Sequence, residues 1–400
     1  MDITIVGAGL SGLTLALALA KAGLPSLLVD KINPYEALAS KNDIRTTAIS
    51  LSSRRLFTVL DVWQKIADSA YPIYDILVSE AGSSSTLHYD YRTIGSEPMG
   101  HIVNNSTLKE SLLTQLENHS SFVSFVDNRS VIALEIKKEQ VLLTLEGGKV
   151  IASKLVIAAD GRNSRVRTLA EIRYTTLDYH QSAIVDTIQH SKRHHNVAYE
   201  RFLPGGPLAL LPLQENHSAM VWSERNAVAE KIANLDDEFF SLALKERLGD
   251  SRGILKSIGP RAVYPLAITI AQSGISKRLA LIGDSFHCLH PIAGQGFNIS
   301  VRDIAVIAEV IVDAARLGLD IGSIPVLEKY QRNRRIDIMS MGAATDLLTR
   351  LFSNDFIPLK RIRCFGLSAM NHIKPLKNIT MLHAMGIIST LPRLLNGKEL

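Results

Sequence analysis

Residues 2–30 read DITIVGAGLSGLTLALALAKAGLPSLLVD, and this stretch decides the fold. A short β-rich run leads through three glycines into an Ala/Leu-rich helical segment, and a second apolar run then closes on a carboxylate. Gly7 permits a tight turn, Gly9 lets a phosphate approach the backbone, and Gly12 lets helix and strand pack closely. Asp30 follows at the spacing, about twenty residues, at which an acid accepts hydrogen bonds from a ribose. The stretch predicts a dinucleotide-binding unit, with an ordinary glycine-rich turn as the competing interpretation.

A second glycine-rich loop lies far along the chain, where residues 283–303 read GDSFHCLHPIAGQGFNISVRD. It follows an apolar run typical of a strand and leads into a helix-like pattern. Asp284 would end the strand, where a carboxylate can accept hydrogen bonds from a polyol. Gly294, Gln295 and Gly296 would give close backbone approach and a row of amide donors at a helix start, which favours anionic or electron-rich ligand atoms.

A third element lies between these two. Residues 154–159 form an apolar run typical of a buried strand, and Asp160 and Gly161 follow it directly. An Asp-Gly pair also simply makes a turn, so this motif alone leaves its role open.

The order of the three motifs resembles that of the group A FAD-dependent aromatic monooxygenases, the family that includes p-hydroxybenzoate hydroxylase. Asp30 is a small departure, because Glu is commoner at this position in the family, yet either carboxylate can serve. The carboxyl-terminal segments resemble the final helices of the ubiquinone-biosynthesis hydroxylase branch. Further segments that resemble this branch are 43–50, 200–213 and 290–298.

The resemblance implies an α/β fold in which a Rossmann-like FAD-binding domain, of the glutathione-reductase type, is interleaved with a second domain. The second domain would be a mostly antiparallel β-sheet that roofs the flavin and binds substrate, and a helical region would end the chain. The expected boundaries are 1–72, 98–170 and 266–312 for the FAD-binding domain, 73–97 and 171–265 for the substrate domain, and 313–400 for the carboxyl-terminal helical region.

The resemblance also implies the chemistry. Family members bind FAD, take NAD(P)H as a transient reductant, and react with O2 to form a flavin C4a-hydroperoxide whose distal oxygen enters a phenol ring. In the ubiquinone branch the substrate would be a polyprenylated phenol. The alternatives are a hydroxylase of a soluble aromatic compound and a weakly active flavin-binding component of a lipid-biosynthetic complex. No second glycine-rich dinucleotide unit follows Gly12, which argues against a flavin disulfide reductase.

The same resemblance assigns roles to single residues. Arg45, Pro291, Gly294 and Gln295 would be the catalytic residues, with Pro291 beside the flavin face. A surface ion pair is the alternative for Arg45, and no general base stands out. The expected cofactor-binding residues are Gly7, Gly9, Gly12, Asp30, Arg45, Asp160, Gly283, Asp284, Gly294, Gln295, Gly296, Phe297 and Asn298.

A metal site is not predicted. His287, Cys288 and His290 are spaced too tightly for a tetrahedral zinc site without further ligands. No CxxC or HExxH pattern occurs elsewhere to supply such ligands.

The composition indicates in which compartment of the cell the protein is expected. Four hundred residues, 46% of them hydrophobic, can bury a large core, and the two cysteines suit a reducing compartment. Met1 leads directly into the first predicted strand, and no apolar run approaches the roughly 18 residues that cross a bilayer. We therefore expect a cytoplasmic protein.

Positive charge is concentrated at the carboxyl terminus. Residues 355–400 carry seven Lys and Arg residues and two acidic residues, and the whole chain has a net charge of +5. Aromatic interleaving, zinc spacing and a helix-turn-helix pattern are all missing, so nucleic acid is not an expected partner. Peripheral contact with the inner face of the membrane, or with a protein complex of ubiquinone biosynthesis, is expected, and a solvated helical face is the alternative.

Overall fold

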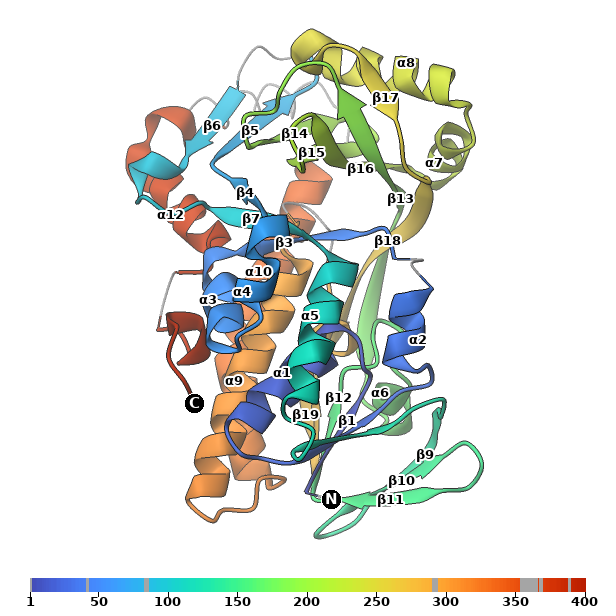
Figure 1. The fold of residues 1–400 in the computed structure, drawn as a ribbon, viewed down its shortest axis with the longest axis vertical. Helices are drawn as coiled ribbons and strands as arrows, with labels where there is room; N and C mark the ends of the chain where they lie inside the picture. Colours follow the sequence, from blue (N-terminus) through green and yellow to red (C-terminus); the bar gives the residue numbers. More distant parts are fainter. Residues whose placement is uncertain are drawn as a thin grey trace.

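Two large β-sheets organise the molecule, one in each half of the view in Figure 1. Both chain ends lie in the lower half (Figure 1). The computed structural model describes residues 2–40, 43–82, 86–289, 294–352, 366, 370–387 and 390–400.

The lower half is built around a six-stranded sheet. In spatial order its strands are β19 (Ile275–Ser276), β20 (Leu279–Leu281), β12 (Leu155–Ala158), β1 (Ile3–Val6), β2 (Ser26–Val29) and β8 (Val123–Val126). Every residue of β1, β2 and β12 is buried, as expected for parallel strands that are covered on both faces. All neighbours are parallel except β19 and β20, so the continuous apolar runs of the sequence form the interior of a parallel sheet.

Helices pack on this sheet and on one another. They are α1 (Leu10–Lys21), α2 (Pro34–Ala39), α3 (Leu51–Val59), α4 (Trp63–Ile66), α5 (Asn105–Glu117), α6 (Arg165–Leu169), α9 (Gly296–Arg316) and α10 (Ile324–Phe352). The Ala/Leu-rich α1 buries most of its length and contacts both α5 and α9, while α10 runs beside α9 (Figure 1). The two long helices α9 and α10 thus hold the carboxyl-terminal third of the chain against the first.

Two small antiparallel sheets complete this half. Their strands are β9 (Val131–Ile136), β10 (Val141–Leu145) and β11 (Val150–Ser153) in one, and β3 (Thr46–Ser50), β7 (Gly100–Asn104) and β4 (Tyr71–Ile73) in the other. The first sheet shares the hydrophobic core of the six-stranded sheet. The second lies near the junction of the two halves (Figure 1).

The upper half is a nine-stranded, mostly antiparallel sheet. Its strands are β21 (His287–Cys288), β18 (Ala262–Ala271), β13 (Tyr174–His190), β16 (His217–Arg225), β15 (Gly206–Pro212), β14 (Val197–Leu203), β5 (Asp75–Glu80) and β6 (Thr86–Asp90), with β17 (Leu255–Ser257) beside β13. Two helices, α7 (Asn226–Ala233) and α8 (Asp237–Leu248), pack on it. The long strands β13 and β18 run down into the lower half (Figure 1), with a register shift between Asp178 and Gln181. The predicted domain boundaries stay predictions.

After α10, further helices pack on the β3–β7–β4 sheet, on the upper sheet and on the helices α3 and α9. These are α12 (Lys374–Ala384) and the 3-10 helix η6 (Leu394–Asn396). Met385 and Leu395 are buried, and Arg393 pairs with Glu309 and Asp313 of α9. Part of the basic segment is therefore core structure. Within the described residues, no helix combines the length and the apolar character that crossing a membrane requires.

Candidate cofactor site

The register of the parallel strands brings the three motifs to one sheet edge. Val6 pairs with Val29 on one side and with Ala158 on the other, and Ala158 pairs with Leu281. Because the carboxyl ends of parallel strands meet at the same edge, the residues that follow them lie together. These residues include Gly7, Asp30, Asp160 and Gly283.

The three glycines of the first loop have different surroundings. At Gly7, φ is +110° and a Cβ would lie 2.3 Å from the Ala159 carbonyl oxygen, while at Gly12 it would lie 1.8 Å from the Gly7 carbonyl oxygen. At Gly9 a Cβ would meet nothing within 4 Å. Gly9 is also the N-cap of α1, and no side chain caps the amides of that helix. The loop thus offers open space and unsatisfied donors, which fit a pyrophosphate.

Asp30 is fixed beside this loop. Its carboxylate accepts hydrogen bonds from the backbone amides of Ala8 (2.5 Å) and Ile32 (3.0 Å). An ionised carboxylate has further lone pairs, so Asp30 can still accept from a ribose hydroxyl. Lys109 of α5 is a nearby cation that the sequence did not single out: burial lowers the pKa of Lys109, and Asp30 and Asp43 oppose that shift.

Asp160 presents an unsatisfied oxygen. Its Oδ2 accepts from the Val166 amide at 3.1 Å, whereas Oδ1 is buried and has no hydrogen-bond partner among the described residues. Burial raises the pKa of Asp160, against hydrogen bonds from Ser164 and Val166. A buried acceptor without a partner is costly, so this oxygen fits a cofactor that donates a hydrogen bond to it.

Arg167 joins the second motif to the third, a role that the sequence did not reveal. Its guanidinium is buried and donates to the carbonyl oxygens of Ser285 (2.8 Å) and Arg162 (2.9 Å). It also lies 4.2 Å from the centre of the Tyr174 ring. Ser285 is 118 positions away along the chain, so no local pattern marks this contact.

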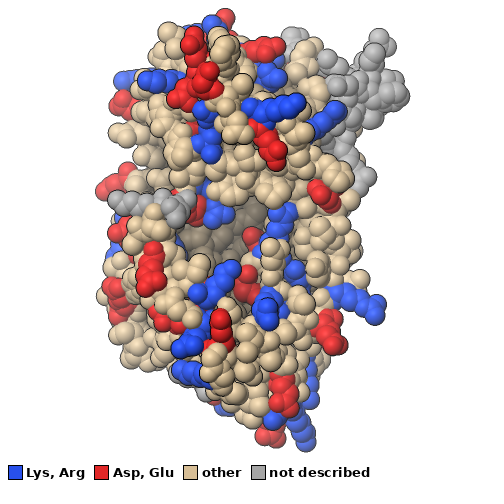
Figure 2. Space-filling view, turned by 90° about the vertical axis from the view of Figure 1, so that its right-hand side faces the viewer, with Lys and Arg blue, Asp and Glu red and all other residues tan. Residues whose placement is uncertain are grey.

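Asp284 faces an opening. Its side chain is exposed, whereas Gly283 and Ser285 on either side are buried. Partial burial of the carboxyl group nevertheless raises the pKa of Asp284, against the charges of His287 and Arg45. These two observations agree if Asp284 lines a recess, and Figure 2 shows the molecule hollowed between its two halves, with charged side chains around the opening.

Arg45 lies in a surface ion pair. It forms a bidentate contact with Asp43, with Nε–Oδ1 at 2.7 Å and Nη2–Oδ2 at 2.8 Å, and its side chain is 53% exposed. Its guanidinium also lies 5.7 Å from the centre of the Tyr264 ring on β18, at the junction with the upper sheet. The ion pair is therefore present, and the predicted catalytic role of Arg45 stays a prediction.

The 294–296 loop leads into α9. At Gly294, φ is +63°, and a Cβ would lie 3.0 Å from the Ala48 Cβ, while the Cβ position of Gly296 is open. Gln295 is the N-cap of α9, whose amides no side chain caps, and its Nε2 donates to the Ala384 carbonyl oxygen at 3.3 Å. The loop thus places the uncapped amides that begin α9 at its end, and their predicted contact with an electron-rich ligand atom stays a prediction. Pro291 lies outside the described residues.

Two neighbouring side chains pack against other elements, and their predicted cofactor contacts stay predictions. Asn298 Oδ1 accepts from the Ser50 amide (2.9 Å) and the Ser53 hydroxyl (2.8 Å), and its Nδ2 donates to a carbonyl oxygen of β3 (2.8 Å). Phe297 stacks on Phe57, with ring centres 6.2 Å apart. These contacts hold α9 against α3 and β3.

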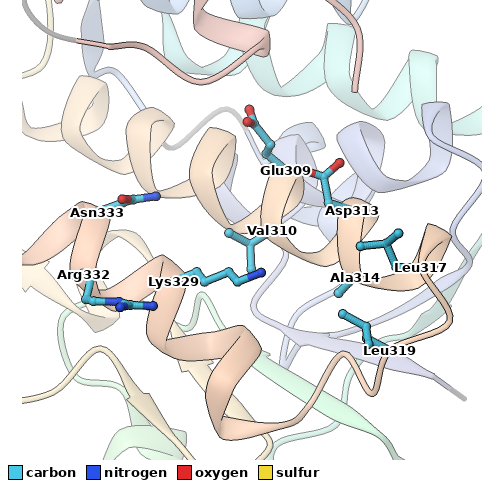
Figure 3. Close-up of a pocket in the computed structure, with 9 residues that line it drawn as sticks. All are labelled: Glu309, Val310, Asp313, Ala314, Leu317, Leu319, Lys329, Arg332 and Asn333. Atoms are coloured by element: carbon cyan, nitrogen blue, oxygen red, sulfur yellow. The ribbon is translucent and has the colours of Figure 1, made fainter.

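Two other features lie apart from this site. In the described part of the chain, no three His, Cys, Asp or Glu side chains are grouped to hold a metal ion, and His290 lies outside that part. A surface pocket of about 460 Å³ lies between α9 and α10 (Figure 3). Glu309 and Asp313 line it, about 20 and 26 Å along α9 from Gly296, and both already pair with Arg393.

The chain is similar to known proteins along its whole length. Residues 1–336 match the family described as FAD binding domain. The chain is 41% identical to ubiquinone hydroxylase UbiL of Rhodospirillum rubrum, over 100% of this chain and 93% of that protein. It is 32% identical to 3-demethoxyubiquinol 3-hydroxylase of Escherichia coli, over 96% of this chain and 98% of that protein.

A solved structure shares the fold. Para-nitrophenol 4-monooxygenase PnpA of Pseudomonas putida superimposes with a TM-score of 0.77 over 100% of this chain and 99% of that chain, at 16% identity. The predicted α/β architecture, an FAD-binding fold combined with a second sheet, is confirmed.

Proposed function

The chain belongs to the FAD binding domain family of aromatic-ring monooxygenases, and we propose that it hydroxylates the ring of a polyprenylated phenol in ubiquinone biosynthesis. FAD is its bound cofactor, NAD(P)H the reductant typical of the family, and O2 the oxygen source. The observation that supports the proposal is the meeting of three cofactor motifs at one sheet edge. Its relatives named ubiquinone hydroxylase and 3-demethoxyubiquinol 3-hydroxylase supply the substrate class.

Different residues of the sheet edge would hold different parts of FAD. FAD, when bound, supplies the oxygen-transfer chemistry that no side chain offers. The open space at Gly9 and the uncapped amides of α1 would take the pyrophosphate, Asp30 the adenosine ribose, and Asp284 the ribityl chain. The amides that begin α9 would stabilise the electron-rich edge of the flavin ring, since preorganised donors cost no rearrangement during the reaction.

An apolar cluster of the protein lies beside the 294–296 loop. Met381, Met385 and Ile102 are buried in it, and Ala48, which contacts the 294–296 loop, packs against it. Methionine side chains adapt to irregular apolar shapes, and an apolar surround keeps water from the reacting ring. The cluster therefore gives the 294–296 loop an apolar neighbour on the protein side.

We also propose that α12 contacts the membrane that holds such a substrate. Ile373, Leu376 and Ile379 follow one another at intervals of three and are 49%, 43% and 56% exposed. Lys374 and Lys377 lie between them along the helix. A helix with an outward apolar face flanked by Lys suits an anionic lipid surface on the inner face of the membrane. A complex of ubiquinone-biosynthesis proteins is the alternative partner for this face.

Substrate-dependent turnover tests the proposal. With the purified FAD-loaded protein, we expect a polyprenylated phenol in liposomes to accelerate NAD(P)H oxidation and to gain one oxygen atom by mass spectrometry. A short phenol without the polyprenyl chain serves as the matched control and should be converted more slowly. Conversion of the short phenol alone would instead indicate a soluble-aromatic hydroxylase. Failure to form any hydroxylated product would indicate a flavin-binding component of a lipid-biosynthetic complex.

A further inference from the structure

Asp303 on α9 is a buried carboxylate that the proposed chemistry leaves without a role. Its side chain is fully enclosed, and it contacts three residues in two segments outside its own turn of α9, the 283–287 loop and α10. Oδ2 accepts from the Gly283 amide (2.9 Å) and lies 2.6 Å from Nε2 of His287, while Oδ1 accepts from Nε of Arg334 (2.6 Å). The carboxylate thus ties the cofactor loop to α10.

Arg334 binds the oxygen of Asp303 that Gly283 does not contact. Its side chain is 3% exposed, and besides Asp303 it donates to Asp337. Asp337 accepts a further hydrogen bond from Arg302 at 2.9 Å, and Arg302 also reaches the His383 carbonyl oxygen of α12 at 3.5 Å. A chain of alternating charges therefore runs from the cofactor loop through α9 and α10 to α12.

Where this series of ion pairs reaches the cofactor loop, the backbone adopts a conformation that favours glycine. At Gly283, φ is +58°, and a Cβ would lie 2.9 Å from the Ser11 hydroxyl. The Gly283 amide points at Asp303, and the side chain of the next residue, Asp284, is exposed. The direction in which Asp284 leaves the backbone therefore depends on the hydrogen bond between Gly283 and Asp303.

The charge state of Asp303 keeps this hydrogen bond in place. Burial alone would raise the pKa of Asp303, but the charges of His287 and Arg334 outweigh burial and hold that pKa below its usual range. A buried ion pair adds little net stability, because the desolvation of both partners offsets their attraction. The ion pair between Arg334 and Asp303 instead fixes the orientation of the Asp303 carboxylate.

We propose that Arg334 is a positioning residue for FAD, which holds the Asp303 carboxylate so that Gly283 and Asp284 face the cofactor. Arg334 touches neither FAD nor substrate and acts through Asp303. The inference rests on FAD binding by the family and is independent of the phenol proposed above.

Arg334→Met in the full-length, FAD-loaded protein tests this role, and Arg335→Met is the matched control, because Arg335 is its exposed neighbour on α10. We expect Arg334→Met to weaken FAD affinity about 10- to 100-fold, the loss expected for one charge-assisted hydrogen bond. The visible absorption spectrum of the flavin that still binds should also change. Arg334→Lys keeps the charge and should restore most of both properties, and Arg335→Met should change neither.

Wild-type affinity and spectrum in Arg334→Met would overturn the proposal. An affinity loss that merely follows a lower melting temperature of the apoprotein, with the bound spectrum unchanged, would also overturn it, since Arg334 would then only stabilise the fold. If Arg334→Met does not fold, the double variant Asp303→Asn with Arg334→Met decides, because it removes both charges of the buried Arg334–Asp303 pair. Weaker FAD binding with an altered spectrum in that variant supports the role, and wild-type binding refutes it.

Discussion

The glycines of the first loop are required for different reasons. Gly12 is required by the protein itself, because a Cβ there would lie 1.8 Å from the Gly7 carbonyl oxygen. Gly9 is not, because its Cβ position is open and its φ of −76° suits any residue. The absence of a side chain at Gly9 therefore leaves room for a bound molecule. A substitution at Gly12 tests folding, and a substitution at Gly9 tests cofactor binding.

Gly9→Val should therefore fold and fail to retain FAD, because the side chain would occupy the space of the pyrophosphate. Gly12→Val is the contrasting variant and should destabilise the apoprotein. Flavin content after purification and the melting temperature of the apoprotein measure the two effects. A Gly9→Val protein that is as yellow as the wild type would show that the pyrophosphate lies elsewhere.

Asp284→Ala should weaken FAD binding by about 1–3 kcal/mol, through the lost hydrogen bonds and the ligand groups left unpaired. Flavin fluorescence titration measures this change, and excess FAD should restore part of the activity. Asp313→Ala on α9 is a suitable control, because Asp313 is exposed and pairs with Arg393 instead. Unchanged affinity in Asp284→Ala would remove Asp284 from the cofactor site.

The buried carboxyl group of Asp160 should make apoprotein stability depend on pH. Because its folded pKa is raised, its contribution is fully present below the pKa of the unfolded chain and is lost as pH rises through the folded pKa. Asp160→Asn cannot ionise, so the apoprotein should be more stable than the wild type at neutral pH. Urea unfolding should show the difference vanishing below about pH 4. A variant that is less stable at neutral pH would contradict this sign.

At the level of elements, α12 combines an inward face that packs with an outward face that has no partner among the described residues. Met381 is buried, whereas Ile379 is 56% exposed. Removing the whole segment would therefore damage the fold, and point substitutions on the outward face are the better test of membrane contact.

Lys374→Glu with Lys377→Glu should reduce flotation with anionic liposomes, at about 1 kcal/mol for each Lys near the surface and less at high salt. Lys231→Glu with Lys245→Glu, on α7 and α8, changes the net charge equally at another exposed site. FAD content should stay unchanged in both variants. Equal loss of flotation in both would assign the effect to net charge and not to α12.

Sequence patterns predicted the elements whose signals are local. Gly7, Gly9, Gly12 and Asp30 fall on one strand–helix–strand unit, and the buried runs became the parallel strands because such runs pair only in a covered sheet. Contacts between distant residues were not predictable. Arg167 and Arg334 look like ordinary surface cations in the sequence, and only the packing of α6 and α10 shows that both are buried.

At the level of the whole molecule, FAD should stabilise both halves together. The strands β13 and β18 run through both, so separate melting would require breaking the longest paired ladder of the upper sheet. At FAD concentrations of 100 times its dissociation constant we expect about 2.7 kcal/mol of added stability and one cooperative transition. Calorimetry with and without FAD measures this. Two transitions, of which FAD moves only one, would show that the halves unfold independently.

The interleaving of the cofactor motifs also sets an order of events during synthesis. The first glycine loop leaves the ribosome early, but β20, which pairs with β12, comes only at Leu279–Leu281, and α9 and Arg334 follow later still. Non-local pairings of this kind form after the intervening chain is complete. The nascent chain therefore acquires its flavin late, and until then the exposed edge of β12 is a surface for a chaperone to shield.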